Sequence, residues 1–317
     1  MKNFEYHPIK LISKKIVLVN GISRTGKLLL GGLVSSFNNT EHFDLGENLE
    51  HIFPAIKFGK IDKNYAKSFI HNYLNQLVYN KYISRNINFR SKDRTGVNKS
   101  RNPKIYYKRL KINDGDAIVN KIKKDNPVFP LVTHELAANL DIIKKLKLNV
   151  KFIEILRDPI DIVYSWYKKG WGKRFGKDQR TFSLLIKKKN KIYPWFSNFN
   201  NEKIKKENEV EKCINYILTL TRISIPHLKK NKKTIFITTY ESLTKNTKNE
   251  LIKIAKFLGT NTNKKTLEFI KREKCPIGVD NSTTKKIYFL KKRCSPKRFK
   301  EILKLQSYYK KNLYGLR

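Results

Sequence analysis

Acidic residues, cysteines and long apolar runs are all scarce in this sequence of 317 residues. The three cysteines are too few and too far apart for a disulfide framework or a cysteine-based zinc site, so we expect a reducing, cytoplasmic environment. No apolar stretch approaches the roughly 20 residues needed to cross a bilayer. The sequence therefore predicts a soluble protein, with a peripheral contact at the inner membrane surface left open.

The shortage of acidic residues leaves a large excess of positive charge. Only 26 Asp and Glu accompany 69 Lys and Arg, which gives a formal net charge of +43. This excess favours anionic partners such as phosphate, sulfate, an anionic glycan, nucleic acid or a membrane surface. A biased base composition explains it equally well, because Lys, Asn and Ile are all abundant.

Patterns typical of nucleic-acid and metal sites are also missing. The sequence has no zinc finger, RNP-type aromatic motif or helix-turn-helix pattern, so we expect no specific nucleic-acid partner. It has no HExxH, Asp cluster or Cys-His spacing, so we expect no metal.

Short apolar runs predict the fold. Each is followed by a helix-compatible stretch, a pattern that predicts an α/β fold with ligands at the C-terminal strand ends. We expect a three-layer sandwich with a central parallel sheet, of the P-loop nucleotide-binding type. The four predicted strands and a weaker fifth are Ile16–Val19, Val128–Val132, Phe152–Leu156, Thr234–Thr239 and His42–Leu45.

We expect one domain over residues 1–317, with two long insertions at about 57–126 and 170–211. The centre of the first insertion is turn-prone and is predicted to be a loop. The second begins with an aromatic and basic segment, GWGKRFGKDQRTF. Insertions at strand ends are where binding specificity is usually determined.

The segment IVLVNGISRTGKLLL places a glycine-rich turn between a strand and a helix. Backbone N–H groups at such a helix N-terminus can bind a phosphate. Gly21, Gly26 and Lys27 also satisfy the GxxxxGK pattern. However, Leu28 replaces the Ser or Thr that holds Mg²⁺ in nucleoside triphosphatases. A P-loop small-molecule kinase therefore stays an alternative.

A second nucleotide motif lies in VKFIEILRDPIDIVYSWY. Arg157 ends a buried strand, and Ser165 follows about two turns into the next helix. The guanidinium and the hydroxyl can converge on one phosphate. Asp158 can cap this helix, and Pro159 suits its first turn.

These motifs resemble the PAPS-dependent sulfotransferase superfamily, whose donor is 3′-phosphoadenylyl sulfate. Arg24, Thr25 and Gly26 are similar to its 5′-phosphosulfate loop, while Lys27 and Leu28 replace the two threonines that normally bind the 5′-phosphate. The missing threonines also leave open a catalytically inactive nucleotide-binding relative.

Two further matches support the resemblance. Arg157 and Ser165 match the Arg and Ser that recognise the 3′-phosphate in this family. The segment TIFITTYESL is similar to a third block, which implies that Tyr240 lies near the adenine. The resemblance implies in-line transfer of a sulfuryl group from PAPS to a hydroxyl or amine, with 3′,5′-ADP as the second product.

Sulfuryl transfer to an alcohol needs a general base for the acceptor proton. His134 follows a predicted strand, as the catalytic histidine of cytosolic sulfotransferases does, and is the first candidate. Glu47 resembles the glutamate base of tyrosylprotein sulfotransferases and is the second. Glu135 adjoins His134 and is a third. Lys27, assisted by Arg24, is the candidate for stabilising negative charge on the leaving phosphate.

The expected partners are the nucleotide donor and a small-molecule, glycan or lipid acceptor. Tryptophans can stack on sugar rings, and nearby cations can attract an anionic acceptor. We favour a glycan or glycolipid acceptor on this basis. The residues concerned are Trp166, Trp171, Trp195, Lys168, Lys169, Lys173 and Arg174.

Overall fold

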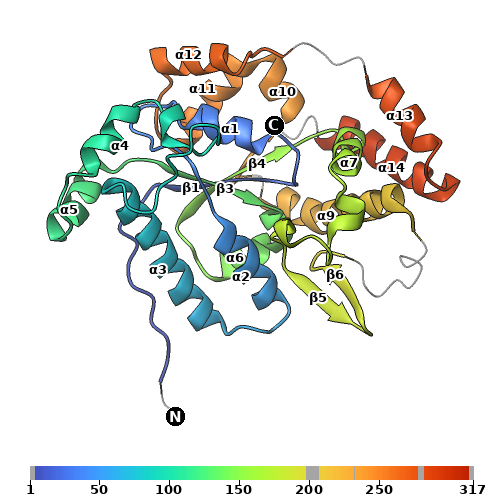
Figure 1. Ribbon diagram of the computed structural model, residues 1–317, viewed down its shortest axis with the longest axis horizontal. Coiled ribbons are helices and arrows are strands. Elements are labelled where there is room, and N and C mark those ends of the chain that lie inside the picture. The colour runs from blue at the N-terminus through green and yellow to red at the C-terminus, as the bar shows by residue number, and fades with distance from the viewer. Residues whose placement is uncertain (1–3, 198–206, 232, 278–281, 314–317) are drawn as a thin grey trace.

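The computed structural model describes residues 4–197, 207–231, 233–277 and 282–313. Its central sheet has five parallel strands in the order β2–β3–β1–β4–β7 (Figure 1). The four predicted strands and the weaker fifth are confirmed, with shifts of a few residues at their ends. Their bounds are β1 Ile16–Gly21, β2 Asp44–Leu45, β3 Phe129–His134, β4 Val150–Leu156 and β7 Phe236–Thr239.

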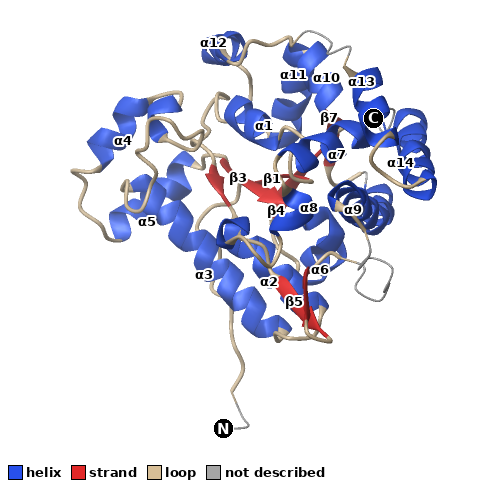
Figure 2. Cartoon of the chain, turned by 45° about the vertical axis from the view of Figure 1, so that its right-hand side comes forward, coloured by secondary structure: helices blue, strands red, loops and turns tan. Residues whose placement is uncertain are grey.

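Helices cover both faces of the sheet, which confirms the predicted α/β sandwich (Figure 2). Successive residues of a strand point to opposite faces. In β1, Ile16 and Leu18 join one core cluster, while Val17 and Val19 join the other. The first cluster is closed by α2 Glu47–Lys57, α3 Lys63–Tyr82, α5 Asp116–Asp125 and α6 Leu140–Lys145. The second is closed by α1 Lys27–Val34, α10 Tyr240–Lys245, α11 Thr247–Leu258 and α12 Lys264–Arg272.

A third apolar cluster surrounds Trp166. Residues of the second insertion take part in it, including Phe175 and Phe196. The insertion also contains a hairpin of two short antiparallel strands. The elements here are α7 Pro159–Lys168, α8 Trp171–Arg174, β5 Leu185–Lys188, β6 Lys191–Pro194, α9 Glu209–Asn231, α13 Thr283–Lys291 and α14 Pro296–Tyr308.

The first insertion contains more regular structure than the sequence indicated. The 20-residue helix α3 packs Ile70, Leu74 and Val78 into the core of one sheet face. The turn-prone stretch after it is mostly loop, as predicted, with one short 3₁₀ turn at Val97–Lys99. This stretch leads into α4, Pro103–Arg109.

A buried ion pair fixes α4 to the sheet. Arg109 donates two hydrogen bonds to the carboxylate of Glu41, at 2.9 and 2.8 Å. The hydroxyl of Tyr106 donates to the same carboxylate at 2.7 Å. Such a bidentate pair satisfies the charges that burial would otherwise leave without partners. Among the described residues, no helix is both long and apolar enough to cross a membrane.

Candidate active site

The loop from Ile22 to Gly26 joins β1 to α1 and needs an unusual backbone. Arg24 and Gly26 have φ values of 77° and 98°, in the left-handed region that favours glycine. A Cβ atom on Gly26 would lie 2.5 Å from the ring of Tyr240. Glycine at position 26 therefore lets the ring of Tyr240 pack directly against the loop.

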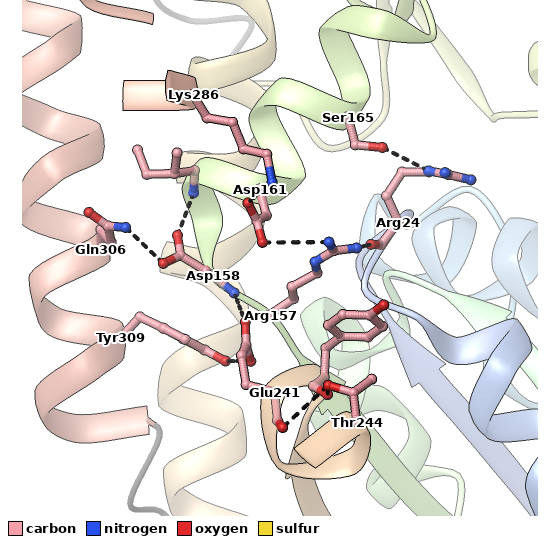
Figure 3. Close-up of polar contacts among 12 residues, drawn as sticks. Arg24, Arg157, Asp158, Asp161, Ser165, Glu241, Thr244, Lys286, Gln306 and Tyr309 are labelled. Carbon is pink, nitrogen blue, oxygen red and sulfur yellow. Dashed lines mark hydrogen bonds and ion pairs between the residues drawn. The ribbon is translucent and has the colours of Figure 1, made fainter. Parts of the chain in front are cut away.

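The two predicted phosphate motifs meet at this loop (Figure 3). Arg24 Nε donates to Ser165 Oγ at 2.9 Å, and Arg157 Nη1 donates to the Arg24 carbonyl at 3.1 Å. The guanidinium of Arg157 also lies over the Tyr240 ring, 4.2 Å from its centroid. Four residues that the sequence motifs singled out are thus in one place, although more than 200 positions separate the first from the last.

Local features of α7 orient Arg157 and Ser165. The side chain of Asp158 caps the helix by accepting the N–H of Ile160 at 2.8 Å, and Pro159 takes the first helical position. Gln306 of α14 donates to the second oxygen of Asp158 at 2.7 Å. The start of α7 is therefore held by a cap and by a contact with a distant helix.

The other three residues predicted to form the phosphate loop, Thr25, Lys27 and Leu28, differ from one another in burial and contacts. Thr25 is buried, and its hydroxyl donates to the Ile22 carbonyl at 2.8 Å, so it shapes the loop. Lys27 is also buried, with Nζ donating to the same carbonyl at 3.3 Å. Leu28 lies beside them with 36% of its surface exposed. Lys27 and Leu28 both line the cavity described next.

A cavity of about 320 Å³ opens over this loop. Its lining is rich in cations, since Arg24, Lys27, Arg94 and Arg157 all contribute to it, against one acid, Glu273. Arg94 donates to Glu273 at 3.1 Å.

Arg157 is incompletely satisfied within this site. Its Nε is buried and has no hydrogen-bond partner among the described residues. Its Nη2 lies 3.5 Å from Asp161, whose other oxygen accepts a 2.9 Å bond from Lys286 on α13 (Figure 3). A buried donor without a partner is costly unless a ligand satisfies it. The guanidinium of Arg157 therefore keeps hydrogen-bonding capacity that the described residues do not use.

His134 ends β3 and is held by the carboxyl group of Glu50 on α2. Glu50 Oε1 lies 2.7 Å from His134 Nδ1 and also accepts the backbone N–H of His134 at 2.8 Å. Because that oxygen already accepts one N–H, it orients the ring with Nδ1 as a second donor, leaving Nε2 for other partners. Burial, with the nearby charge of Lys27, lowers the pKa of His134 to about 4.

Three acidic residues act electrostatically on Lys27. Burial lowers the pKa of Lys27 to about 8, against the opposing effect of Glu135, Glu50 and Glu154. Burial also raises the pKa of Glu50 and that of Glu154, each to about 8. Glu135 accepts the N–H of Ser23 at 2.9 Å, and burial raises its pKa too.

A second cavity, of about 200 Å³, lies on the other side of His134. Its acidic side chains are Glu47, Glu50 and Glu135. The second insertion supplies most of the opposite wall, which is largely aromatic. Those aromatic residues are Trp171, Phe175, Phe182, Trp195 and Phe196.

Trp166 has a different role from the one the sequence suggested. It is 1% exposed, and its Nε1 donates to the Ser23 carbonyl at 2.8 Å. It therefore supports the loop after β1. Although it is part of the cavity wall, almost none of its surface is left to contact a ligand. Trp171 is better placed to contact a ligand, because it lines the cavity and is partly exposed, whereas Trp195 is only 6% exposed.

The sequence matches the model of the sulfotransferase domain over residues 14–277. The chain belongs to the sulfotransferase family. It is accordingly a PAPS-dependent sulfotransferase, as the motifs indicated. No curated protein is significantly similar to it.

Two solved structures resemble this sulfotransferase at a distance. One is the sulfotransferase domain from the curacin biosynthetic pathway, at 12% identity and a TM-score of 0.48, covering 94% of this chain and 99% of that domain. The other is the sulfotransferase domain of the Synechococcus PCC 7002 olefin synthase, at 11% identity and a TM-score of 0.47, covering 98% of each chain.

Two residues at the site of this sulfotransferase escaped the sequence analysis. Glu50 is three residues after Glu47, so one turn of a helix puts both on the same face, and that spacing was a usable signal. Lys286 lies in a basic segment without the usual family pattern, and nothing in its neighbourhood distinguished it from the other lysines. Within the described ranges, no three His, Cys, Asp or Glu side chains are grouped so as to hold a metal ion.

Proposed function

We propose that this sulfotransferase transfers the sulfuryl group of PAPS to a hydroxyl of an uncharged acceptor that contains a ring, with His134 as the general base. One observation carries the proposal. His134 and Ser23 line both cavities, the cationic one and the aromatic one. A base at such a boundary can reach the acceptor hydroxyl while the acceptor faces the donor.

The cationic cavity has the groups that the donor requires. Arg157, with its unsatisfied Nε, and Ser165 would hold the 3′-phosphate, and Arg24 and the loop N–H groups would hold the 5′-phosphosulfate. Tyr240 packs on Gly26 and would contact the adenine. When bound, PAPS supplies the sulfuryl group and a phosphate leaving group.

His134 has the orientation and charge state of a base. With Nδ1–H donating to Glu50, the lone pair on Nε2 is free to take the proton of the acceptor hydroxyl. The low pKa keeps the ring neutral at pH 7. The acceptor oxygen then forms the new bond to sulfur as the bond from sulfur to the phosphate oxygen breaks. Lys27 and Arg24 would stabilise the charge on that oxygen.

In this assignment Glu50 is a positioning residue and Glu47 lines the acceptor cavity. Glu47 is exposed at the first turn of α2, whereas Glu50 contacts His134 directly. Glu135 is engaged by the N–H of Ser23 and would hold the loop. His134 thus remains the first candidate for the base.

The second cavity indicates the class of acceptor. Aromatic rings favour the apolar faces of a ring-containing molecule, and carboxylates accept hydrogen bonds from its hydroxyls. With three acidic side chains and one cation, Arg180, in its lining, this cavity offers an anionic acceptor few favourable contacts. A neutral sugar, free or attached to a lipid, fits both features.

The test is calorimetric titration of the protein with 3′,5′-ADP, ATP and ATP plus Mg²⁺, followed by transfer of labelled sulfate from PAPS to neutral and anionic sugars. We expect 3′,5′-ADP to bind much more tightly than ATP with or without Mg²⁺, and neutral sugars to be the better acceptors. A preference for ATP with Mg²⁺ would favour a kinase. Binding of neither nucleotide would point to an inactive relative.

A further inference from the structure

A row of aromatic rings lies on α3, outside both cavities. Tyr65, Phe69 and Tyr73 are spaced four residues apart, so they lie on one face of the helix. Their rings follow one another with centroids 6.3 and 6.4 Å apart and interplanar angles of 27° and 9°. Tyr6 of the N-terminal segment extends the row, with its ring 5.0 Å from that of Tyr65. We call these four residues the aromatic row.

The row forms the wall of a groove of about 300 Å³. Part of it reaches solvent, since 38% of Tyr65 and 48% of Tyr6 are exposed. The remaining lining is amide or hydroxyl: Asn48, Ser68, Asn72 and Gln76. Among the described residues, the eight that line the groove are all uncharged, although 30% of the whole chain is charged. An uncharged groove of this kind does not select a nucleotide, an anionic lipid or an acidic peptide.

The first turn of α2 borders both the groove and the proposed acceptor cavity. Asn48 lines the groove, and its neighbour Glu47 lines the cavity. The Tyr73 hydroxyl lies 3.5 Å from the Leu45 carbonyl, just before that turn. In Figure 1, α3 and α2 lie next to each other, and the β5–β6 hairpin lies on the other side of α2. A chain-like molecule could therefore occupy the cavity and the groove together.

We propose that the aromatic row binds further sugar units of a neutral oligosaccharide whose terminal unit occupies the acceptor cavity. Flat aromatic faces bind the apolar faces of sugar rings. The amides of Asn48, Asn72 and Gln76 can donate and accept hydrogen bonds with sugar hydroxyls without any charge. The cavity alone has room for little more than one ring at about 200 Å³. The proposal rests on the proposed function for the terminal sugar unit, but the groove can be tested by binding alone.

The experiment uses the full chain saturated with 3′,5′-ADP and three neutral hexasaccharides, namely cellohexaose, maltohexaose and chitohexaose in its N-acetylated form. Calorimetry gives the dissociation constants for the wild type, for Tyr65→Ala, and for Tyr65→Ala combined with Asn72→Ala. Tyr107→Ala is the matched control, because Tyr107 is a similarly exposed tyrosine on α4, away from the groove. Size-exclusion chromatography accompanies each variant.

We expect at least one hexasaccharide to bind the wild type, with affinity about fivefold lower in Tyr65→Ala and further reduced in the double variant, as the loss of a ring contact predicts. The control should stay within about twofold of the wild type. In turnover assays the double variant should raise KM for the hexasaccharide and leave kcat and the KM of the monosaccharide unchanged.

Three results would overturn the proposal: no hexasaccharide binds, the double variant binds as the wild type does, or the variants change the oligomeric state instead of sugar affinity. The last result would make the row an interface with a second copy of the chain. Failure of the proposed function looks different, because 3′,5′-ADP would then bind no better than ATP with Mg²⁺, or not at all, whatever the hexasaccharides do.

Discussion

The two cavities beside His134 differ in charge, although both belong to one strongly basic chain. The cavity over the loop after β1 is lined by four cations and one acid. The cavity beneath the second insertion has three glutamates and one arginine, Arg180. Basic composition alone would favour cations in both. The difference matches the proposed roles of the two cavities, the cationic one for the donor and the acidic, aromatic one for an uncharged acceptor.

His134 lies where the two environments meet. Its ring contacts a carboxylate on one side and is close to Lys27 on the other. Residues that belong only to the donor side should affect nucleotide binding, and residues that belong only to the acceptor side should affect turnover. Four measurements test this division, beginning with the largest expected effect.

Replacing His134, the proposed base, should separate turnover from nucleotide binding most clearly. We expect His134→Ala to lower kcat by about 10²- to 10⁴-fold, because general-base catalysis contributes about that much. Affinity for 3′,5′-ADP should stay within about twofold of the wild type. His227→Ala, on α9, is the control. A parallel loss of nucleotide affinity would place His134 on the donor side and contradict the division.

Removing Arg157 should affect nucleotide binding instead. Arg157→Ala should weaken 3′,5′-ADP binding by about 10- to 100-fold, the size of a lost charged hydrogen bond. Binding of 5′-AMP, which lacks the 3′-phosphate, should change far less. Calorimetry with both nucleotides measures the difference, with Arg85→Ala as the control at an exposed ion pair. Equal losses of affinity for the two nucleotides would show that Arg157 does not recognise the 3′-phosphate.

Two substitutions of Glu50 separate its effect on the orientation of the His134 ring from the effect of its own charge. Glu50→Ala should lower kcat about tenfold, since the His134 ring loses its partner on Nδ1. Glu50→Gln should restore most of the activity, because an amide oxygen can still accept both N–H groups. Steady-state kinetics and 3′,5′-ADP titration on the two variants test this. If Gln were as damaging as Ala, the carboxylate charge would be what matters.

The pH dependence of kcat near neutrality should be the smallest of the four effects. The pKa of His134 is lowered to about 4, so the ring is neutral and able to accept a proton at any pH well above 4. We therefore expect kcat to stay nearly constant from pH 7 to about 5 and to fall by half near pH 4. A fall in kcat centred near pH 6.5, the ordinary pKa of histidine, would mean that the His134 ring is solvated or that another group is the base.

Much of the fold followed from short sequence patterns. The buried strands are continuous apolar runs such as IVLV, which need no knowledge of their neighbours to be recognised. Helix α7 begins where Asp158 and Pro159 predict, because capping depends on residues close in sequence. Helix α3 was less visible, since its core residues are interspersed with tyrosines, asparagines and lysines that resemble a surface segment.

The candidate site likewise combines features that local sequence predicts with contacts that only the tertiary structure shows. The sequence by itself determined the strand, loop and helix that carry Arg24, Gly26, Arg157 and Ser165, because each motif is contiguous. Only the tertiary structure decided that Glu50 holds His134, 84 positions away, and that the second insertion lines the proposed acceptor cavity. Such contacts depend on how separate elements pack across the sheet, and that packing is fixed by the summed burial of many apolar side chains, which no local pattern encodes.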